Sequence, residues 1–437
     1  MRIRLPSFRT SFTVLGTLFV GSALVAACAE SGGGASDPSG TAAATSTTTG
    51  AGGATSSSTS GQGGDIISGP TGTGGGTTCS PGTNDDDADS DGYTENDGDC
   101  NDCDALVSPD AVEVIAEPDD MGNVPPPADE DCDGKIDVLA PPCDGALVKD
   151  SPDPMDAARA IGACDYVTKA TWVQADGLPP PNDPTKLANY HLGHGILSDL
   201  GANNPAREGT QLLVLSSGTA RQEGDAEYVH RNFDKGYQGN APFGFPKESP
   251  SCPGVTTDAP HDAAGLEVEF KAPSNAKGVS FDFNFFTFEW PKFICTEFND
   301  FFVAIMSPIP MGQTDGNISF DQQSNPISVN NAFLQSCGCP AGPPCAVPPG
   351  AALKSFDCTL GKTVLQGTDF DADDTNPGWT NGATDWLRTT APVTPGTKFT
   401  IRFTTYDSSD GFVDSTVLID NWKWSAKPGT IKTDIPD

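Results

Sequence analysis

Strict alternation of apolar and polar residues marks the segment 278–288, GVSFDFNFFTF. Over most of its length every second residue is large and apolar, namely Val279, Phe281, Phe283 and Phe285. Since successive side chains of a strand point to opposite faces, this pattern predicts an antiparallel strand with one buried face. The alternation changes phase at Phe286 and Phe288, which predicts either a β-bulge or a strand end that is buried on both faces.

Segments of the same kind recur and predict further strands. They cover residues 211–217, 265–270, 300–306, 317–320, 397–406 and 414–424, separated by clusters of Gly, Pro, Asn and Asp. The best helix candidate is 153–164, DPMDAARAIGAC, where an acidic start precedes a modest apolar stripe. Many strands with long loops are typical of β-sandwiches. The sequence therefore predicts a mainly β fold over residues 144–437, an antiparallel β-sandwich of jelly-roll-like type.

The N-terminus carries the pattern of an export signal. Three arginines within residues 2–9 precede an apolar run at 12–27, which has the order of a secretory signal and is short for a membrane span. The run ends in LVAAC, and the small residues directly before Cys28 resemble the lipobox of bacterial lipoproteins. This resemblance implies that residues 1–27 are removed and that lipidation of Cys28 anchors the chain to a membrane.

The residues after Cys28 suggest where the chain is held. Residue 29 is Ala, not the aspartate that retains lipoproteins in the inner membrane, so the outer membrane and cell surface are the expected location. The alternative is an ordinary signal peptide with an incidental cysteine. From 29 to 78, 42 of 50 residues are Gly, Ser, Thr or Ala. Too few apolar groups remain to offset the entropy of ordering, which predicts a disordered tether over 28–78.

Cysteine usage and charge agree with export. Thirteen cysteines less Cys28 leave twelve, an even number that predicts disulfides in an oxidising compartment, with the pairing left open. The formal net charge is −35. Such a charge argues against nucleic acid as a partner, because binding nucleic acid requires a basic surface, and it favours divalent cations.

Residues 79–143 form a strongly acidic module that contains cysteines. Its span 84–137 holds 20 Asp or Glu residues and a single basic residue. In DADSDG (87–92) three aspartates alternate before a glycine, a spacing that directs several oxygens at one hard cation such as Ca²⁺. An EF-hand would need Glu at the twelfth loop position, where this chain has Gly98, so the loop is of another kind. A solvated acidic spacer is the alternative.

The acidic module resembles a short metal-binding module of secreted bacterial proteins, and also the calcium-binding type 3 repeats of thrombospondin. The first half of the pattern matches Asp87, Asp89, Asp91, Gly92, Tyr93, Gly98, Asp99, Cys100 and Asp102. The second half matches Asp129, Asp131, Cys132, Asp133, Gly134 and Asp137. The resemblance implies that these aspartates and the Tyr93 carbonyl bind structural Ca²⁺ and that Cys100 and Cys132 form a disulfide. Cys79 or Cys143 could be the partner of Cys103.

The predicted sandwich resembles the choice-of-anchor L domain of bacterial surface proteins over about residues 165–426. The similarity is carried by SSGTA (216–220), the segment 280–306, NPISVNN (325–331) and DSSDGFVDSTVLIDNWKW (407–424), which occur in the family's order. Because that domain occurs beside varied surface anchors, the resemblance implies a fold and a surface location. It implies no activity.

A second cation site is one interpretation of acidic residues in the predicted sandwich. The candidates lie at strand ends and are Glu297, Asp300, Asp407, Asp410 and Asp414. They would bind a second Ca²⁺ if these ends meet at one end of the sandwich. The alternative is that Asp300 and Asp414 are buried caps that accept hydrogen bonds from backbone amides.

Sequence patterns typical of enzymes are weak. His191 and His194 have the spacing of zinc ligands on a helix, but the glycines around His194 disfavour a helix. His261-Asp262 could belong to a triad, but no G-x-S-x-G motif supplies its serine. The cysteines of segment 337–358 favour disulfides over zinc in an exported chain. The sequence therefore predicts a protein that is not an enzyme.

Two classes of function remain. The first is a surface-displayed, calcium-dependent binding or adhesion module with a glycan or protein ligand. The second is an architectural lipoprotein of the cell envelope without a specific ligand, and an exported hydrolase is a weaker third. Trp290, Trp379 and Trp386 lie near predicted loops. Exposed, they would suit stacking on sugars, and as core residues they would favour the architectural role.

Overall fold

The computed structural model describes residues 83–436 except for 116–121, 125, 331–332, 338–355, 357 and 372–380. The expected signal peptide, Cys28 and the tether lie outside the described residues. The described residues all belong to one compact unit of the chain.

Within these described ranges, no helix has the length and apolar character needed to cross a membrane.

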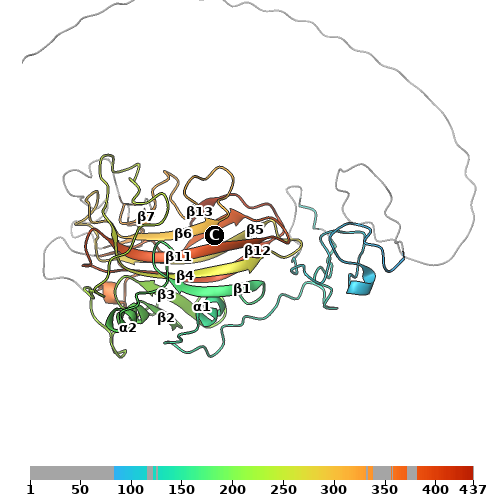
Figure 1. Ribbon diagram of the computed structural model, residues 1–437, viewed down its shortest axis with the longest axis horizontal. Coiled ribbons are helices and arrows are strands. Elements are labelled where there is room, and N and C mark those ends of the chain that lie inside the picture. The colour runs from blue at the N-terminus through green and yellow to red at the C-terminus, as the bar shows by residue number, and fades with distance from the viewer. Residues whose placement is uncertain are drawn as a thin grey trace, which may run out of the picture. The chain divides into compact units, whose positions relative to one another are not determined.

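Two antiparallel sheets pack face to face and form a β-sandwich, which confirms the predicted fold class (Figure 1). The five-stranded sheet has the order β1 (Val167–Val173), β4 (Pro260–Lys271), β11 (Lys398–Ser408), β6 (Phe301–Ser307) and β7 (Ile327–Ser328). The eight-stranded sheet has the order β13 (Lys432–Asp434), β10 (Leu387–Pro392), β5 (Gly278–Thr287), β12 (Ser415–Ser425), β3 (Leu212–Ser216) and β2 (His194–Leu197). The remaining two strands of that sheet, β8 (Ser336–Cys337) and β9 (Gly382–Ala383), pair beside β5.

The main core lies between the sheets and is built from the alternating residues of β5. Phe281 packs edge-on against Phe403 of β11 with ring centroids 4.9 Å apart, and Phe283 lies 4.8 Å from Phe302 of β6. All four rings are fully buried. The alternation in the sequence therefore places one aromatic row of β5 against the facing sheet.

The phase change at the end of β5 is a strand end that is buried on both faces. Pairing between β5 and β12 keeps one register from Thr287 to Asp282, so β5 has no bulge there. Phe286 and Phe288 belong to a second apolar cluster on the opposite face, where each packs against Phe370, at 5.3 and 4.1 Å. Of the two interpretations that the sequence left open, the structure shows the second.

Both α-helices begin with an aspartate followed by a proline. Helix α1 (Pro154–Ala160) lies within the predicted segment, and the Asp153 side chain accepts a hydrogen bond from the Met155 amide. Helix α2 (Pro184–Leu192) was not predicted, although Asp183 caps it in the same way. An N-cap aspartate before a first-turn proline is a strong start signal, so α2 could have been found from its sequence. In the part of the chain that the structure describes there are also two short 3₁₀ helices, η1 (Glu95–Asp97) and η2 (Asp369–Asp371).

One predicted strand, 317–320, is wrong. The segment makes only isolated bridges, from Asn317 to Ile305 and from Phe320 to Pro326. The Asn317 side chain accepts a hydrogen bond from the Ala304 amide at 3.1 Å. The Asn317 side chain thus accepts from a backbone amide of β6 that would otherwise donate to the backbone of a neighbouring strand.

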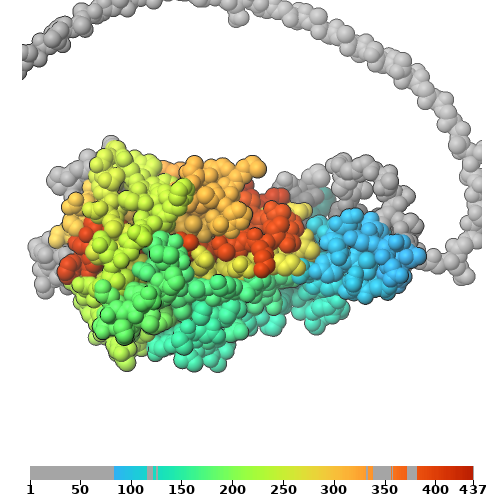
Figure 2. Space-filling view, in the orientation of Figure 1, coloured from blue at the N-terminus to red at the C-terminus, as the bar shows by residue number. Residues whose placement is uncertain are grey.

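The acidic module docks on the sandwich through a small polar contact. The Asn275 side chain, fully buried, accepts from the Val112 amide at 3.0 Å and donates to the Val112 carbonyl at 2.8 Å. Lys271 pairs with Asp110 at 2.6 Å, and the Tyr166 hydroxyl donates to the Ala111 carbonyl at 2.7 Å. In Figure 2 the first part of the module, in blue, lies against the sandwich accordingly.

Candidate metal centre

Two loops of the acidic module repeat one backbone conformation. We call residues 87–102 the first acidic loop and residues 129–137 the second. In the first loop, the Asp87 side chain accepts from the Gly92 amide at 3.1 Å, and in the second Asp129 accepts from the Gly134 amide at 3.0 Å. Both glycines have a left-handed backbone, with φ of 101° and 86°, which explains why glycine occupies this turn.

The repeat extends to the middle of each loop. Asp89 accepts from the Asp91 amide at 3.2 Å, and Asp131 accepts from the Asp133 amide at 3.1 Å. A disulfide between Cys100 and Cys132 joins the two loops, the pairing that the resemblance implied. The two halves of the sequence pattern are therefore two copies of one turn, linked covalently.

Buried carboxylate oxygens that lack a hydrogen-bond donor occur in both loops and in the segment between them. They are Asp89 Oδ2, Asp91 Oδ2, Asp99 Oδ2, Glu113 Oε2, Asp129 Oδ1 and Asp137 Oδ1. Asp99 is only 5% exposed and Glu113 only 8%. In each of these two side chains the other oxygen accepts from a backbone amide, of Asn101 and Asp137 respectively, which fixes the orientation of the carboxylate. A buried acceptor without a donor is costly unless a cation or water binds it.

The carboxylates converge in three groups, each with oxygens within 4.8 Å of one another. The groups are Asp87, Asp89 and Asp91; Asp89, Asp99 and Asp102; and Glu113, Asp129 and Asp131. Ligand sets made only of oxygen suit Ca²⁺, which takes six to eight oxygens, and they do not suit zinc. The residues present therefore fit Ca²⁺.

Burial changes the acidity of these carboxyl groups. Burial, together with the nearby charges of Asp91, Asp99 and Asp102, raises the pKa of Asp89 from 3.8 to about 6. Burial likewise raises the pKa of Asp91, Asp99 and Glu113. Without a cation, ionising these groups costs free energy. A bound divalent cation would remove that cost.

The raised pKa predicts opposite pH effects with and without calcium. Because the Asp89 pKa is about 6 in the fold and 3.8 as a free group, the calcium-free fold loses stability as the pH rises through this window. With calcium, protons compete with the cation, so stability falls as the pH falls through about 6. We expect acidification from about pH 7 to about pH 5 to slow proteolysis of the module in EDTA and to accelerate it in Ca²⁺. Cleavage rates are normalised to an unstructured peptide, and the same sign in both conditions would contradict the prediction.

The remaining predicted ligands differ in their positions. Asp102 accepts from the Ala88 amide at 2.8 Å, within the first loop. Tyr93 donates its amide to Asp91 at 2.9 Å. Asp133 is exposed and pairs with Lys135 at 2.6 Å, so the structure places it at the surface, outside the three groups.

Glu113 is the site residue that sequence reasoning missed. It lies in the segment 108–114 between the two matched halves, where spacing alone gives no sign of a ligand. Its only signal is its place in the Pro-x-Ala-x-Glu stretch of the module that this segment resembles.

Further disulfides support an oxidising environment. The described pairs besides Cys100–Cys132 are Cys143–Cys164, Cys252–Cys295 and Cys337–Cys358. Cys103 is disulfide-bonded too. Since Cys143 is bonded to Cys164, it is excluded as the partner of Cys103, and Cys79 lies outside the described residues. The Cys337–Cys358 disulfide agrees with the preference for disulfides over zinc in this segment.

The five candidates for a second cation site come together in part: Asp300, Asp407 and Asp414 are buried, and the charges of Asp300 and Asp414 raise the pKa of Asp407. None of the three acidic groups found in the described ranges includes them. Glu297 is exposed. Asp300 accepts from the Ser408 amide at 3.2 Å and from the Ser415 hydroxyl at 2.7 Å, and Asp414 accepts from the Phe233 amide at 3.1 Å. Asp300 and Asp414 are thus buried caps, the alternative that the sequence left open.

Asp407 and Asp410 have separate surroundings. Asp407 is fully buried beside Asp300, and burial raises the pKa of both well above the usual range. Asp410 is partly exposed and accepts from the Phe412 amide at 3.2 Å. Burial therefore disfavours the charged form of both Asp300 and Asp407.

The two histidines that have the spacing of zinc ligands contact each other. His191 lies in the last turn of α2 while His194 begins β2, and their ring nitrogens lie 2.9 Å apart. The buried His194 ring also stacks on Trp172 at 3.8 Å. Both are accounted for as packed side chains.

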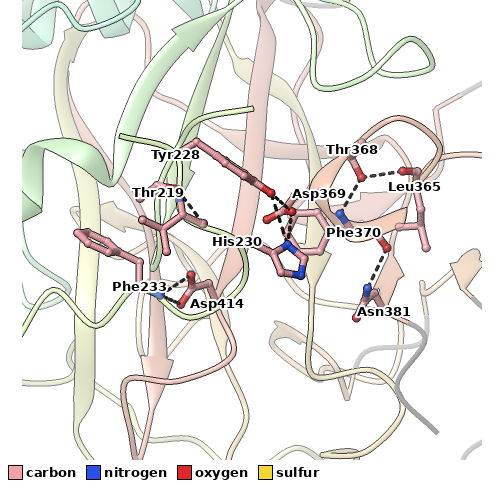
Figure 3. A network of polar contacts seen from close by, with 11 residues as sticks. Thr219, Tyr228, His230, Phe233, Leu365, Thr368, Asp369, Phe370, Asn381 and Asp414 are labelled. Atoms are coloured by element: carbon pink, nitrogen blue, oxygen red, sulfur yellow. Dashed lines mark hydrogen bonds and ion pairs between the residues drawn. The ribbon is translucent and has the colours of Figure 1, made fainter. Parts of the chain in front are cut away.

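A further histidine takes part in a polar network at the second apolar cluster. Figure 3 shows Tyr228 and His230 both directed at Asp369, and Asp414 at the Phe233 amide beside them. The adjoining cavity encloses about 20 Å³, room for one water and too little for a substrate. The network joins the segment at 219–233 to the segment at 365–371.

Two of the three tryptophans proposed for sugar stacking are core residues. Trp290 is fully buried and Trp386 is 6% exposed. Trp379 lies outside the described residues. Trp290 and Trp386 are therefore excluded as residues that stack on a glycan.

Together, the two packed sheets and the disulfides define a disulfide-bonded β-sandwich protein of the extracellular type. Residues 186–423 match the choice-of-anchor L domain, more than half of the 437 residues. The chain belongs to this family. No curated protein and no solved structure matches it.

Proposed function

We propose that this protein is a non-catalytic surface lipoprotein whose acidic module binds Ca²⁺ and supports a β-sandwich that binds a partner outside the cell. The observation that carries the proposal is the set of buried, donorless carboxylate oxygens in the two linked acidic loops. Such oxygens need a cation or water, and the all-oxygen groups suit calcium. Membership of the choice-of-anchor L family does not by itself indicate a ligand, so the calcium and the partner belong to the proposal alone.

The calcium is structural in this proposal. Among the described residues of the module few apolar side chains are buried, Val107 and Ala111 among them, and these do not make a sizeable core. Bound cations and the Cys100–Cys132 disulfide replace that core. The polar contact through Asn275 then holds the ordered module against the sandwich.

In this proposal, lipidation at Cys28 supplies the anchor. The disulfides and the family support it, because both indicate an extracellular protein. We expect Cys28→Ala to move the protein from the membrane fraction into the medium, because the substitution removes the acylated thiol. Immunoblots of the fractions measure this.

The matched control for the anchor is Cys103→Ala, which also removes a cysteine but leaves the lipobox intact and should stay with the membranes. Fractionation of Cys28→Ala with membranes would contradict the lipid anchor.

An architectural lipoprotein without a specific ligand is the second candidate. The burial of Trp290 and Trp386 favours it, because these rings are then part of the core. The two candidates differ in one respect. A binding protein needs a ligand site on the sandwich or on the acidic module, and an architectural lipoprotein needs none.

A further inference from the structure

A cleft of about 190 Å³ lies where the acidic module meets the sandwich. The module contributes Val112, Glu113 and Asp131 to its lining, together with residues 139–142. The sandwich contributes Tyr166 and the end of β12. The volume is small beside the roughly 300–1,000 Å³ of sites for drug-sized ligands, so it suits one ring of a longer ligand.

One wall of the cleft is part of the candidate metal centre. Glu113 and Asp131 line the cleft and also belong to the third carboxylate group, with Asp129. One oxygen of each of these carboxylates already accepts from a backbone amide, so the group offers one further oxygen from each residue, fewer than the six to eight that Ca²⁺ takes. A cation held there would therefore have coordination positions left for oxygens of a ligand in the cleft.

The other wall is aromatic. Tyr166 and Trp424 pack edge to face with ring centroids 5.9 Å apart, and both are only partly buried. The hydrogen bond from the Tyr166 hydroxyl to the Ala111 carbonyl fixes the tyrosine ring. Rigid, partly exposed rings provide a surface on which the apolar face of a sugar can stack.

Two lining residues have buried polar atoms without partners. Trp422 is 3% exposed, and its Nε1 has no acceptor. Glu208 Oε2 has no donor, although Oε1 accepts from Lys423 at 2.7 Å. A ligand with hydroxyl groups can serve both a donor and an acceptor.

We propose that this cleft binds a neutral glycan, whose sugar ring stacks on the aromatic wall and whose neighbouring hydroxyl groups complete the coordination of the Ca²⁺ at Glu113 and Asp131. The inference rests on the proposed function, because it requires calcium at that group. The cleft is lined by acidic residues, namely Glu113, Asp131, Asp165 and Glu208. Lys423 also lines it, but its charge is already paired with Glu208. Anionic sugars are therefore disfavoured.

The test measures binding of the full-length protein to an array of neutral oligosaccharides that end in mannose, glucose, galactose or N-acetylglucosamine. We expect binding in Ca²⁺ that EDTA abolishes and that Trp424→Ala weakens at least tenfold. Glu208→Gln, which leaves the packing of Trp424 on Phe270 in place, is the second variant and should also weaken binding. Phe412→Ala removes a ring that is 57% exposed outside the cleft and should leave binding unchanged.

Calcium protection of residues 83–137 from protease is measured on the same samples. Protection without glycan binding, or glycan binding that persists in EDTA or in both cleft variants, overturns the inference and leaves the proposed function standing. If calcium does not protect the wild-type protein from protease, both the inference and the proposed function are overturned. Calcium-independent capture of poly-L-lysine in place of the glycans would assign the cleft to a cationic peptide and overturn the glycan assignment.

Discussion

Removing calcium from the full-length protein with EDTA is expected to accelerate proteolysis within residues 83–137 by on the order of 100-fold, for calcium at about 100 times its dissociation constant. The reason is that calcium binds the folded loops and not the opened ones, so chelation raises the population that a protease can cut. Fragments are separated after reduction, because the Cys100–Cys132 disulfide would hold cut ends together.

Removing the charge of a single buried carboxylate should have the same effect as removing calcium. Asp99→Asn removes the charge of a side chain that is 5% exposed and belongs to the second carboxylate group. We expect the variant to be cut rapidly even in calcium. Glu95→Gln makes the same chemical change at an exposed position of the first loop and should behave as wild type. Equal cleavage of the wild-type protein with and without EDTA would contradict the calcium module.

Phe283→Ala is expected to lower the free energy of unfolding of the sandwich by about 3–5 kcal/mol. Phe283 is fully buried between the sheets and packs against Phe302 with centroids 4.8 Å apart. Removing the ring loses its transfer free energy and leaves a cavity in a closely packed core. Urea unfolding followed by tryptophan fluorescence measures the difference.

Phe412→Ala is the control for the core prediction, because the same ring is deleted at a position that is 57% exposed. Its expected change is within about 0.5 kcal/mol. A cost below about 1 kcal/mol for Phe283→Ala would place Phe283 outside a packed interface between sheets.

The strands that were predicted are those whose buried face is apolar. β5 and β11 carry alternating aromatic and aliphatic residues, and the periodicity of two identifies them. β10 alternates too, but one of its buried positions is Thr389, whose hydroxyl bonds to Ser319 and Thr433, each at 2.9 Å. Because the buried residue at position 389 is polar, it does not count as apolar in the alternating pattern, and β10 was therefore not predicted.

β1 was missed for a different reason. It pairs with β4 alone, at the edge of its sheet, and Val167 and Ala170 are its partly buried apolar residues before the buried Trp172. An edge strand covers little core, so its sequence carries weak periodicity.

The candidate metal centre was predictable where the ligands are close in sequence. The spacing of Asp87, Asp89 and Asp91 follows from one turn, and a turn is a local property. Glu113 approaches Asp129 and Asp131 from another part of the chain, and such a contact depends on tertiary structure. The cleft beside Trp424 depends on the docking of the module, which no pattern in the sequence indicates.

Calcium titration of the full-length protein by isothermal calorimetry tests the central claim most directly. The acidic module should bind at least two Ca²⁺ ions per chain, with dissociation constants of about 10⁻⁴ to 10⁻³ M or lower, as in other extracellular modules. Asp99→Asn and Glu113→Gln, which belong to different carboxylate groups, should each remove one binding event. An absence of saturable binding at about 10 mM Ca²⁺, or unchanged binding in both variants, would contradict it.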